Sequence, residues 1–273
     1  MKILVCFKVT PDYEALREAD WATAAAGRVE TRYAQPVLNC FDESALEIAL
    51  RLSEALAAMG LTASLGALSI GGREAEPFLK TLQALGYGRA ARVQPDADLD
   101  FAPAVVASII AGYVSRADQS DLLLLGCRSG PGDSGTVPFL VAEALGWPCL
   151  TQVTEISPLT DHRVRAACTV DAGLLSLTVP LPCVLAVGNA VVSRLRVPTL
   201  KDRLAHKNAR FDVLGTADLG IDAAEQLRGL RCALTGFEPI SRTRRGVVIG
   251  GETPHEKAQL LFDSHLKGIL ETI

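Results

Sequence analysis

The sequence lacks the arrangements that catalysis or a resident metal would require. No Ser/His/Asp order, motif-borne carboxylate pair or cluster of metal ligands stands out along the 273 residues. The seven cysteines are scattered and never in C-x-x-C spacing, and the four histidines are isolated. We therefore expect no catalytic residues and no metal site, and we interpret the cysteines as reduced thiols of a cytoplasmic protein.

Long apolar runs and an excess of positive charge are missing as well. No apolar stretch approaches the roughly 20 residues that span a bilayer, and the opening segment MKILVCFKVTPDYE lacks the order of a secretory signal. A formal net charge of −4 argues against nucleic acid or an acidic membrane as the main partner. Hydrophobic residues make up 49% of the chain, which suits a soluble protein with a large core.

The first half of the chain alternates between strand and helix patterns. Short apolar runs predict buried strands at residues 2–9, 62–70, 89–94, 121–126 and 148–153. Apolar residues at helical spacing predict helices at residues 42–60, 73–86, 100–117 and 136–146. Asp42 is the expected N-cap of the first helix and Gly60 its stop signal. Repeated βα units with short connections predict an α/β fold, Rossmann-like, with a parallel sheet covered on both faces.

The pattern changes after about residue 153. Residues 163–170, 174–179 and 182–188 are extended segments without helices between them, which predicts an antiparallel addition to the sheet or a hairpin beside it. From residue 189 onward little could form a separate core, and 254–273 has the spacing of an amphipathic helix. We therefore expect an α/β domain at 1–188 and an arm at 189–273. The arm packs either on a partner subunit or on its own domain.

A glycine-rich loop follows the strand predicted at 121–126. It contains G-x-G-x-x-G at Gly130, Gly132 and Gly135 and leads into a predicted helix, whose unpaired N–H groups suit a phosphate. The Rossmann dinucleotide fingerprint fits poorly, because it belongs after the first strand and directly at the strand end. A Walker loop is excluded because no Lys-Ser or Lys-Thr ends the run. A nucleotide monophosphate, the phosphate end of a larger adenine cofactor, and a turn without a ligand stay open.

Two further stretches are expected at the same edge of the sheet. The chain leaving the first strand, CFKVTPDY, and the turn before the first helix, LNCFDES, both lie at carboxyl ends of strands, where parallel sheets bind ligands. Asn39 offers an amide to a ribose or an adenine edge, and Phe41 or Cys40 could line its face. Alone, these residues fit loop anchors equally well. Their joint placement with the glycine loop favours a nucleotide site.

Five stretches, in order between residue 2 and about residue 220, match the motifs of a known family. They are ILVCFKVTPD, NCFDESALEIALRLSE, LGCRSGPGDSGT with AEALGWPC, DAGLLSLTVPLPCVLA and LRVPTLKDRLAHKNA. Together they resemble the beta subunit of electron transfer flavoproteins, the FixA-like family. The ordered set is far more specific than the glycine pattern alone.

The resemblance implies a fold of the ETF/HUP type and a heterodimer with an alpha subunit that carries the electron-transferring FAD. The beta subunit binds AMP in ordinary members and a second FAD in electron-bifurcating ones, and its C-terminal arm surrounds alpha. A recognition loop, here near residues 189–199 with Val192 or Leu195 as its apolar anchor, docks on a flavin dehydrogenase that donates electrons. The cofactor-binding residues implied by the motifs are Cys6, Asn39, Cys40, Phe41, Asp42, Ile70, Gly126, Cys127, Arg128, Ser129, Gly130, Pro131, Gly132, Asp133, Ser134, Gly135, Thr136 and Val137.

The chain departs from the family pattern at three places. In the glycine loop, residues 128–131 read RSGP where the family has Gln-Ala-Ile-Asp. Arg128 is either a surface charge or a cation that favours ligands more negative than AMP. Residues 168–175 lack the usual Arg and Glu that face the flavin domain in many members. The recognition loop reads NAVVSRLR, so we expect a partner outside the common acyl-CoA dehydrogenases.

The main hypothesis is an electron-carrier subunit rather than an enzyme. A carrier needs no catalytic motif, because the isoalloxazine ring performs the redox chemistry while the protein sets its position and environment. Two alternatives stay open. One is a bifurcating-type subunit with a second FAD, and the other is a non-redox adenine-nucleotide-binding module, such as a sensor or an ATP-using enzyme of the same fold.

Overall fold

The computed structural model describes residues 1–17, 19–21, 29–130, 132–230 and 246–271. Contacts divide the chain into two compact units, Met1–Gly236 and Phe237–Ile273, and each is considered by itself. The first unit contains the sheet and the candidate site.

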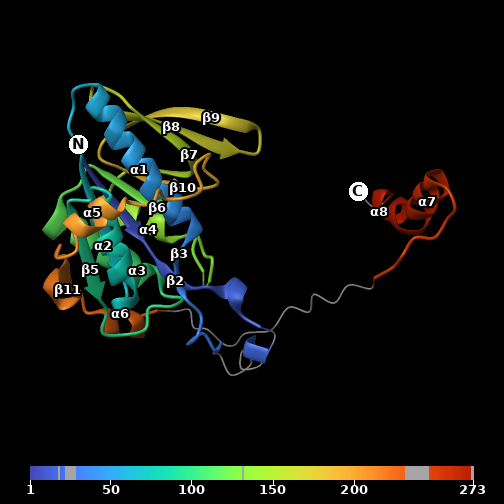
Figure 1. Ribbon diagram of the computed structural model, residues 1–273, viewed down its shortest axis with the longest axis horizontal. Helices are drawn as coiled ribbons and strands as arrows, with labels where there is room; N and C mark the ends of the chain where they lie inside the picture. Colours follow the sequence, from blue (N-terminus) through green and yellow to red (C-terminus); the bar gives the residue numbers. More distant parts are fainter. Residues whose placement is uncertain (18, 22–28, 131, 231–245, 272–273) are drawn as a thin grey trace. The chain divides into compact units, whose positions relative to one another are not determined.

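The first unit is built on one sheet, which has nine strands in the described part of the chain (Figure 1). In spatial order they are β11 (Asp212–Gly215), β5 (Arg89–Gln94), β4 (Ser64–Ile70), β1 (Lys2–Phe7), β6 (Leu122–Gly126), β10 (Cys183–Val187), β7 (Cys149–Pro158), β8 (Arg163–Val170) and β9 (Gly173–Pro180). Neighbours from β11 to β7 pair in parallel, whereas β7–β8 and β8–β9 pair antiparallel. This confirms the predicted parallel α/β fold with an antiparallel addition.

One predicted strand lies elsewhere in the sheet than expected, and one strand was not predicted at all. The segment predicted at 182–188 does not join the antiparallel addition: it forms β10, which lies between β6 and β7 and is parallel to both. The strand β11 lies beyond residue 188 and extends the opposite edge of the sheet, parallel to β5. The first unit therefore includes part of the segment that was expected to belong to the arm.

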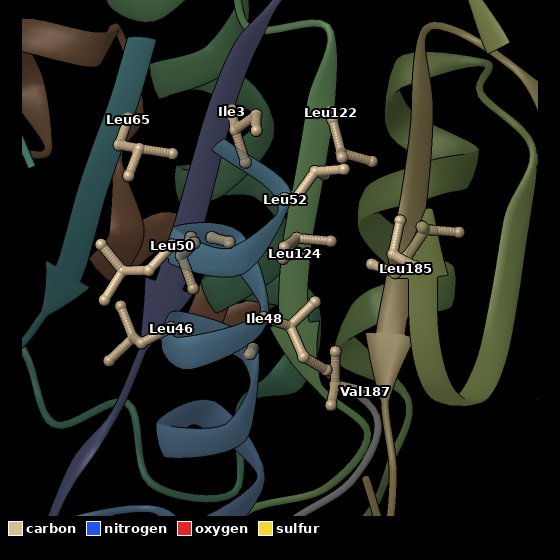
Figure 2. Packing of buried hydrophobic residues seen from close by; sticks show 14 of the residues in the cluster. Ile3, Leu46, Ile48, Leu50, Leu52, Leu65, Leu122, Leu124, Leu185 and Val187 are labelled. Atoms are coloured by element: carbon tan, nitrogen blue, oxygen red, sulfur yellow. The ribbon is translucent and has the colours of Figure 1, made fainter. Parts of the chain in front are cut away.

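Helices cover both faces of the sheet, as predicted for βα units. One apolar cluster joins the sheet to α1 (Cys40–Ala58) and α2 (Glu76–Ala84), and a second joins it to α3 (Pro103–Tyr113) and α4 (Val137–Leu145). Successive side chains of β1 alternate between the two clusters, as the period of a strand requires: Ile3 and Val5 belong to the first, Leu4 and Cys6 to the second. Figure 2 shows side chains of α1 packed against the first face.

The helix α1 follows from its sequence. Apolar residues at helical spacing, among them Leu46, Leu52 and Leu56, are buried against the sheet. The helix ends at Ala58, and Gly60 follows with a positive φ of 75°, which confirms the predicted stop. The shorter elements of the first unit are β2 (Val9–Pro11), β3 (Pro36–Leu38), η1 (Tyr13–Ala15), η3 (Arg73–Ala75), η4 (Val114–Asp118), α5 (Leu200–Ala205), η5 (Ala217–Leu219) and α6 (Ala223–Arg228).

The second unit contains the helical segment expected near the C-terminus. It comprises α7 (Pro254–Leu261), a π-helical turn η6 (Phe262–Leu266) and α8 (Lys267–Leu270). A capping box starts α7: the Thr253 hydroxyl accepts from the Glu256 N–H, and the Glu256 carboxylate accepts from the Thr253 N–H. In the described ranges, no helix is both long enough and apolar enough to cross a membrane.

Candidate nucleotide-binding site

The strand order reverses between β1 and β6. From β1 the chain continues to β4 and β5 on one side of the sheet, then crosses to β6 on the other side of β1 (Figure 1). In parallel α/β sheets, ligands bind beyond the carboxyl ends of the strands at such a point. The carboxyl ends of β1 and β6, near Lys8 and Gly126, therefore define where a ligand site is expected.

The start of α1 connects these two strand ends through Asp42. One carboxylate oxygen, Oδ2, accepts the Lys8 N–H at 2.9 Å, and the other, Oδ1, accepts the Gly126 N–H at 2.6 Å. These two bonds are called the Asp42 bridge below. Asn39 adds two contacts: its backbone N–H donates to the Lys8 carbonyl at 3.0 Å, and its side-chain amide donates to the Arg128 carbonyl at 2.8 Å. One helix start thus holds both strand ends and the beginning of the glycine loop.

The expectation that Asp42 caps α1 is wrong. The helix begins at Cys40 with Asn39 in the N-cap position, and the Asn39 side chain makes no capping bond. Both side chains instead bond backbone groups at the switch point: Asp42 accepts from the N–H groups of Lys8 and Gly126, and Asn39 donates to the Arg128 carbonyl. Sequence spacing alone points to a local cap, whereas the carboxylate actually serves backbone groups distant in the chain.

Burial controls the protonation of the groups in this region. Burial raises the pKa of the Asp42 carboxyl to about 6, while hydrogen bonds from the Lys8 and Gly126 N–H groups act in the opposite direction. Burial, and then the neighbouring Asp42, raise the pKa of the Cys6 thiol far above its usual range. Burial also raises the pKa of Cys127. Both thiols are therefore neutral at physiological pH, so they line the candidate site as uncharged groups and are not reactive thiolates.

Gly126 has a steric reason to be glycine. A Cβ atom at this position would lie 2.5 Å from Asp42 Oδ1 and 2.8 Å from Phe41 Cβ. The bare backbone therefore allows α1 to approach the end of β6. The next N–H, that of Cys127, donates to the Val187 carbonyl at the end of β10 at 2.7 Å. The loop thus leaves the sheet with its first two amides already bonded inside the protein.

The helix α4 begins at the end of the glycine loop. Its N-cap residue, Thr136, makes no side-chain capping bond, and the Thr136 hydroxyl lies 3.2 Å from that of Ser134. The N–H groups of the first turn of a nine-residue helix carry a partial positive charge and favour an anion. Arg128 lies nearby in the loop, 3.4 Å from Asp133 and with its guanidinium 6.0 Å from the centre of the Phe41 ring. The glycine loop therefore combines amide donors with the Arg128 guanidinium, which is paired with the Asp133 carboxylate.

The residues that the motifs implied for the cofactor are brought together at one edge of the sheet. Cys6 is buried at the end of β1, Ile70 ends β4, and residues 39–42 begin α1. Residues 126–137 run from the last residue of β6 to the first of α4, and Pro131 lies outside the described residues.

The two expected recognition anchors, Val192 and Leu195, belong neither to the Asp42 bridge nor to the glycine loop. The segment 189–199 is held on the side of α1 by two carboxylates: Glu43 accepts the Leu195 N–H, and Glu47 accepts the Arg196 N–H, both at 3.1 Å. Leu195 packs on the apolar cluster of α1, and Val192 is half-buried. The apolar side chains that this segment exposes most are those of Val191 at 88% and Val197 at 76%.

An ion pair that the sequence patterns missed fixes this segment. Glu47 is buried in the second turn of α1, and its carboxylate accepts from the Arg196 guanidinium at 2.8 Å and from Arg51 at 3.2 Å. Arg196 also contacts Glu54. The acidic residues lie at helical spacing on α1, but their partner Arg196 lies about 150 positions away in the chain. No local sequence pattern therefore indicates the contact.

Within the described residues, no group of three potential ligand side chains is arranged to hold a metal ion. The arrangement instead offers amide donors, one guanidinium and neutral walls at a topological switch point. This combination of fold and site defines an α/β protein of the Rossmann-like class.

Comparison with known proteins gives the family. The electron transfer flavoprotein domain matches residues 27–214. The chain is 33% identical over 270 residues, 98% of both chains, to the Escherichia coli K12 protein called "Putative electron transfer flavoprotein subunit YgcR". It is 27% identical over 223 residues, 82% of both chains, to "Electron transfer flavoprotein subunit beta" of Mycobacterium tuberculosis H37Rv and of Mycobacterium leprae. The chain belongs to the electron transfer flavoprotein family, and the resemblance to its beta subunits is confirmed.

Proposed function

We propose that this chain pairs with an FAD-carrying alpha subunit and, in that complex, passes electrons from a flavin dehydrogenase to an acceptor. The observation that carries the proposal is the arrangement at the β1–β6 switch point, where the Asp42 bridge and the glycine loop meet in a member of this family. The protein supplies position and environment, and the flavin supplies the redox chemistry. The complex acts as an electron carrier in the cytoplasm.

The ligand at this switch point is AMP. Its phosphate is held by N–H groups of the loop 126–137 that follow Cys127 and by those of the first turn of α4, with Arg128 as counter-charge. The Gly126, Cys127 and Asp133 amides take no part, because they are already bonded to Asp42, Val187 and the Ser129 carbonyl. The remaining nucleoside lies toward Cys6, Ile70 and the Asn39 turn. AMP supplies no electrons there; it contributes binding energy that stabilises the folded subunit.

The helical segment of the second unit and the segment 189–199 both bind protein partners. In the second unit, taken by itself, Ile269 and Leu270 of α8 are 59% and 60% exposed, and apolar side chains at such exposure favour a contact with another surface. We assign this helical segment to the alpha subunit. Val191 and Val197, on the segment 189–199, are assigned to the dehydrogenase contact in place of Leu195, whose side chain is packed inward.

Co-expression with the alpha-type subunit of the same organism tests the proposal. We expect a stable yellow 1:1 complex that contains one FAD and releases AMP on denaturation. A colourless chain that never pairs with a flavoprotein would contradict the carrier function. ATP hydrolysis by the isolated chain would favour the non-redox alternative, and two FAD per heterodimer with NADH oxidation would favour the bifurcating one.

A matched pair of variants tests the role of the arm. Ile269→Asp introduces a charge on the exposed apolar side of α8, and His255→Asp introduces the same charge at an exposed polar position in the first turn of α7. We expect the first to weaken the complex at least tenfold, an affinity loss of about 1.4 kcal/mol, and the second to leave it unchanged. Equal retention of the alpha subunit by both variants would exclude α8 as its docking element.

A further inference from the structure

At three glycines of the candidate site, other protein atoms lie close to the position that a Cβ atom would take. The Cβ position of Gly126 is filled by Asp42 and Phe41, as described above. A Cβ on Gly135, which has a positive φ of 63°, would lie 3.2 Å from Arg128 Cγ. A Cβ on Gly132, with φ of 94°, would lie 3.1 Å from Cδ1 of the Phe101 ring. The bare faces of these glycines are therefore covered by the protein itself and are closed to a ligand.

The covering of these glycines by protein atoms distinguishes the loop from a dinucleotide-binding loop. In such loops, a glycine without a side chain lets the backbone approach the pyrophosphate. Here the bare side of Gly132 faces the ring of Phe101, and the Cβ position of Gly130 lies 3.7 Å from Cε2 of Tyr13. The two aromatic rings thus stand along the middle of the loop, beside the amides that follow Cys127.

The Phe101 ring is held in place by its own loop. Phe101 has φ of 62°, a left-handed conformation that a residue with a Cβ rarely adopts and keeps only when its surroundings impose it. Its neighbours provide that constraint. Asp100 pairs with Lys8 at 3.3 Å, at the end of β1, and its N–H donates to Asp98 at 2.9 Å. Leu99 packs on the apolar cluster of α3.

Tyr13 is also fixed by local contacts. It begins the short helix η1, which Asp12 caps by accepting the Glu14 N–H at 3.1 Å. The Asp12 N–H in turn donates to the Gln35 carbonyl at 2.9 Å, at the end of the β2–β3 ribbon. Burial, and then the neighbouring Asp100, raise the pKa of the Tyr13 hydroxyl. Tyr13 therefore stays neutral, and it lies close to the loop that carries Phe101.

We propose that Tyr13 and Phe101 are specificity-determining residues which restrict the nucleotide site to an adenine nucleotide with a single phosphate. The proposal rests on the nucleotide site proposed above and names its ligand class. The proposal places a second phosphate, and whatever nucleoside follows it, on the side of Gly130 and Gly132 that the two rings occupy. The rings therefore act by exclusion, and neither the motifs nor the family match assigns them this role.

Binding of AMP, ADP and FAD to the full chain, measured by calorimetry, tests the proposal. For the wild-type protein we expect AMP to bind at least about tenfold more tightly than ADP, and FAD to bind more weakly still. Phe101→Gly removes the ring, and glycine adopts the left-handed backbone without strain, so this variant keeps the fold. We expect it, and Tyr13→Ala, to reduce the preference for AMP over ADP to about threefold or less. Tyr33→Ala, at an exposed aromatic of the same N-terminal segment, is the matched control and should keep the wild-type ratio.

The outcomes separate the two proposals. If the wild type binds AMP and ADP equally, or FAD as tightly as AMP, the role of the rings is refuted while the nucleotide site stands. The same holds if a folded Phe101→Gly variant keeps the full preference for AMP. If the wild type binds none of the three nucleotides, the proposed nucleotide site itself is wrong. Thermal unfolding of each variant shows whether it is folded.

Discussion

Replacing Asp42 by Asn tests whether burial or hydrogen bonding has the larger effect on the pKa of the Asp42 carboxyl. The two effects oppose each other: burial favours the neutral carboxyl, and the N–H groups of Lys8 and Gly126 favour the carboxylate. Burial is the larger, and it raises the pKa from the ordinary value of 3.8 to about 6. A difference of this size corresponds to about 3 kcal/mol between the two protonation states.

The direction of the pH effect follows from which state binds the proton more tightly. Between the two pKa values the folded protein carries more protons on Asp42 than the unfolded chain, so stability falls as pH rises. The contribution of Asp42 to the free energy of unfolding is fully present below the pKa of the unfolded chain, and it is lost as pH rises through the folded-state pKa of about 6. The Asp42→Asn variant has no such titration. The unfolding free energy of the wild type, relative to the variant, should therefore fall by about 3 kcal/mol over the whole range and by about 1 kcal/mol between about pH 5 and pH 7.5.

Urea unfolding of both proteins in identical buffers at about pH 5, 6 and 7.5 measures this difference. Groups that titrate elsewhere in the chain cancel in the comparison, because both proteins contain them. A relative stability that rises with pH would mean that the two N–H bonds outweigh burial, and the reasoning would fail. A difference that does not change with pH would show that Asp42 does not titrate in this range.

Four further substitutions have defined expectations. Gly126→Ala forces a Cβ against the Asp42 bridge and should destabilise the chain by about 1–3 kcal/mol in urea unfolding, with loss of AMP binding in calorimetry; unchanged binding would contradict the close approach of α1. Arg196→Gln leaves the buried Glu47 with Arg51 alone and should cost about 2–4 kcal/mol, whereas Arg51→Gln, on the exposed side of the same carboxylate, should cost less than about 1 kcal/mol; equal costs would refute the unequal roles. Tyr87→Phe removes a buried 2.7 Å bond to a carbonyl of α1 and should cost about 1–2 kcal/mol in the same assay, and a neutral result would show that the carbonyl is satisfied otherwise.

The sheet was predictable from the sequence because its determinants are local. Short apolar runs and helical spacing identify β1, β4, β5 and β6 and the helices between them, and the right-handed crossover then brings their carboxyl ends to one edge. The loop 126–137 could be placed at this edge for the same reason. The return of β10 into the parallel part was not predictable, since a short apolar run does not reveal its neighbours in the sheet.

The contacts that build the site were largely not predictable. Asp42 and Gly126 are 84 positions apart, and a carboxylate near a helix start has the same sequence signature whether it caps the helix or bridges two strands. The glycine pattern was informative about backbone freedom but not about what fills the space beside it. For Gly132 the occupant is Phe101, whose left-handed backbone has no sequence signal at a phenylalanine.

The helix α1 links the candidate nucleotide site to the segment that the motifs assign to partner recognition. Its first turn holds the ends of β1 and β6 through Asp42, and Glu47, in its second turn, holds Arg196. The two anchor points are five residues apart, about 8 Å along a helix that rises 1.5 Å per residue. Any displacement of the helix start therefore displaces the recognition segment as well. The proposed AMP carries no electrons, but by binding beside this start it would fix α1 against the sheet, and in this way a ligand without redox chemistry can set the position of a partner-binding surface.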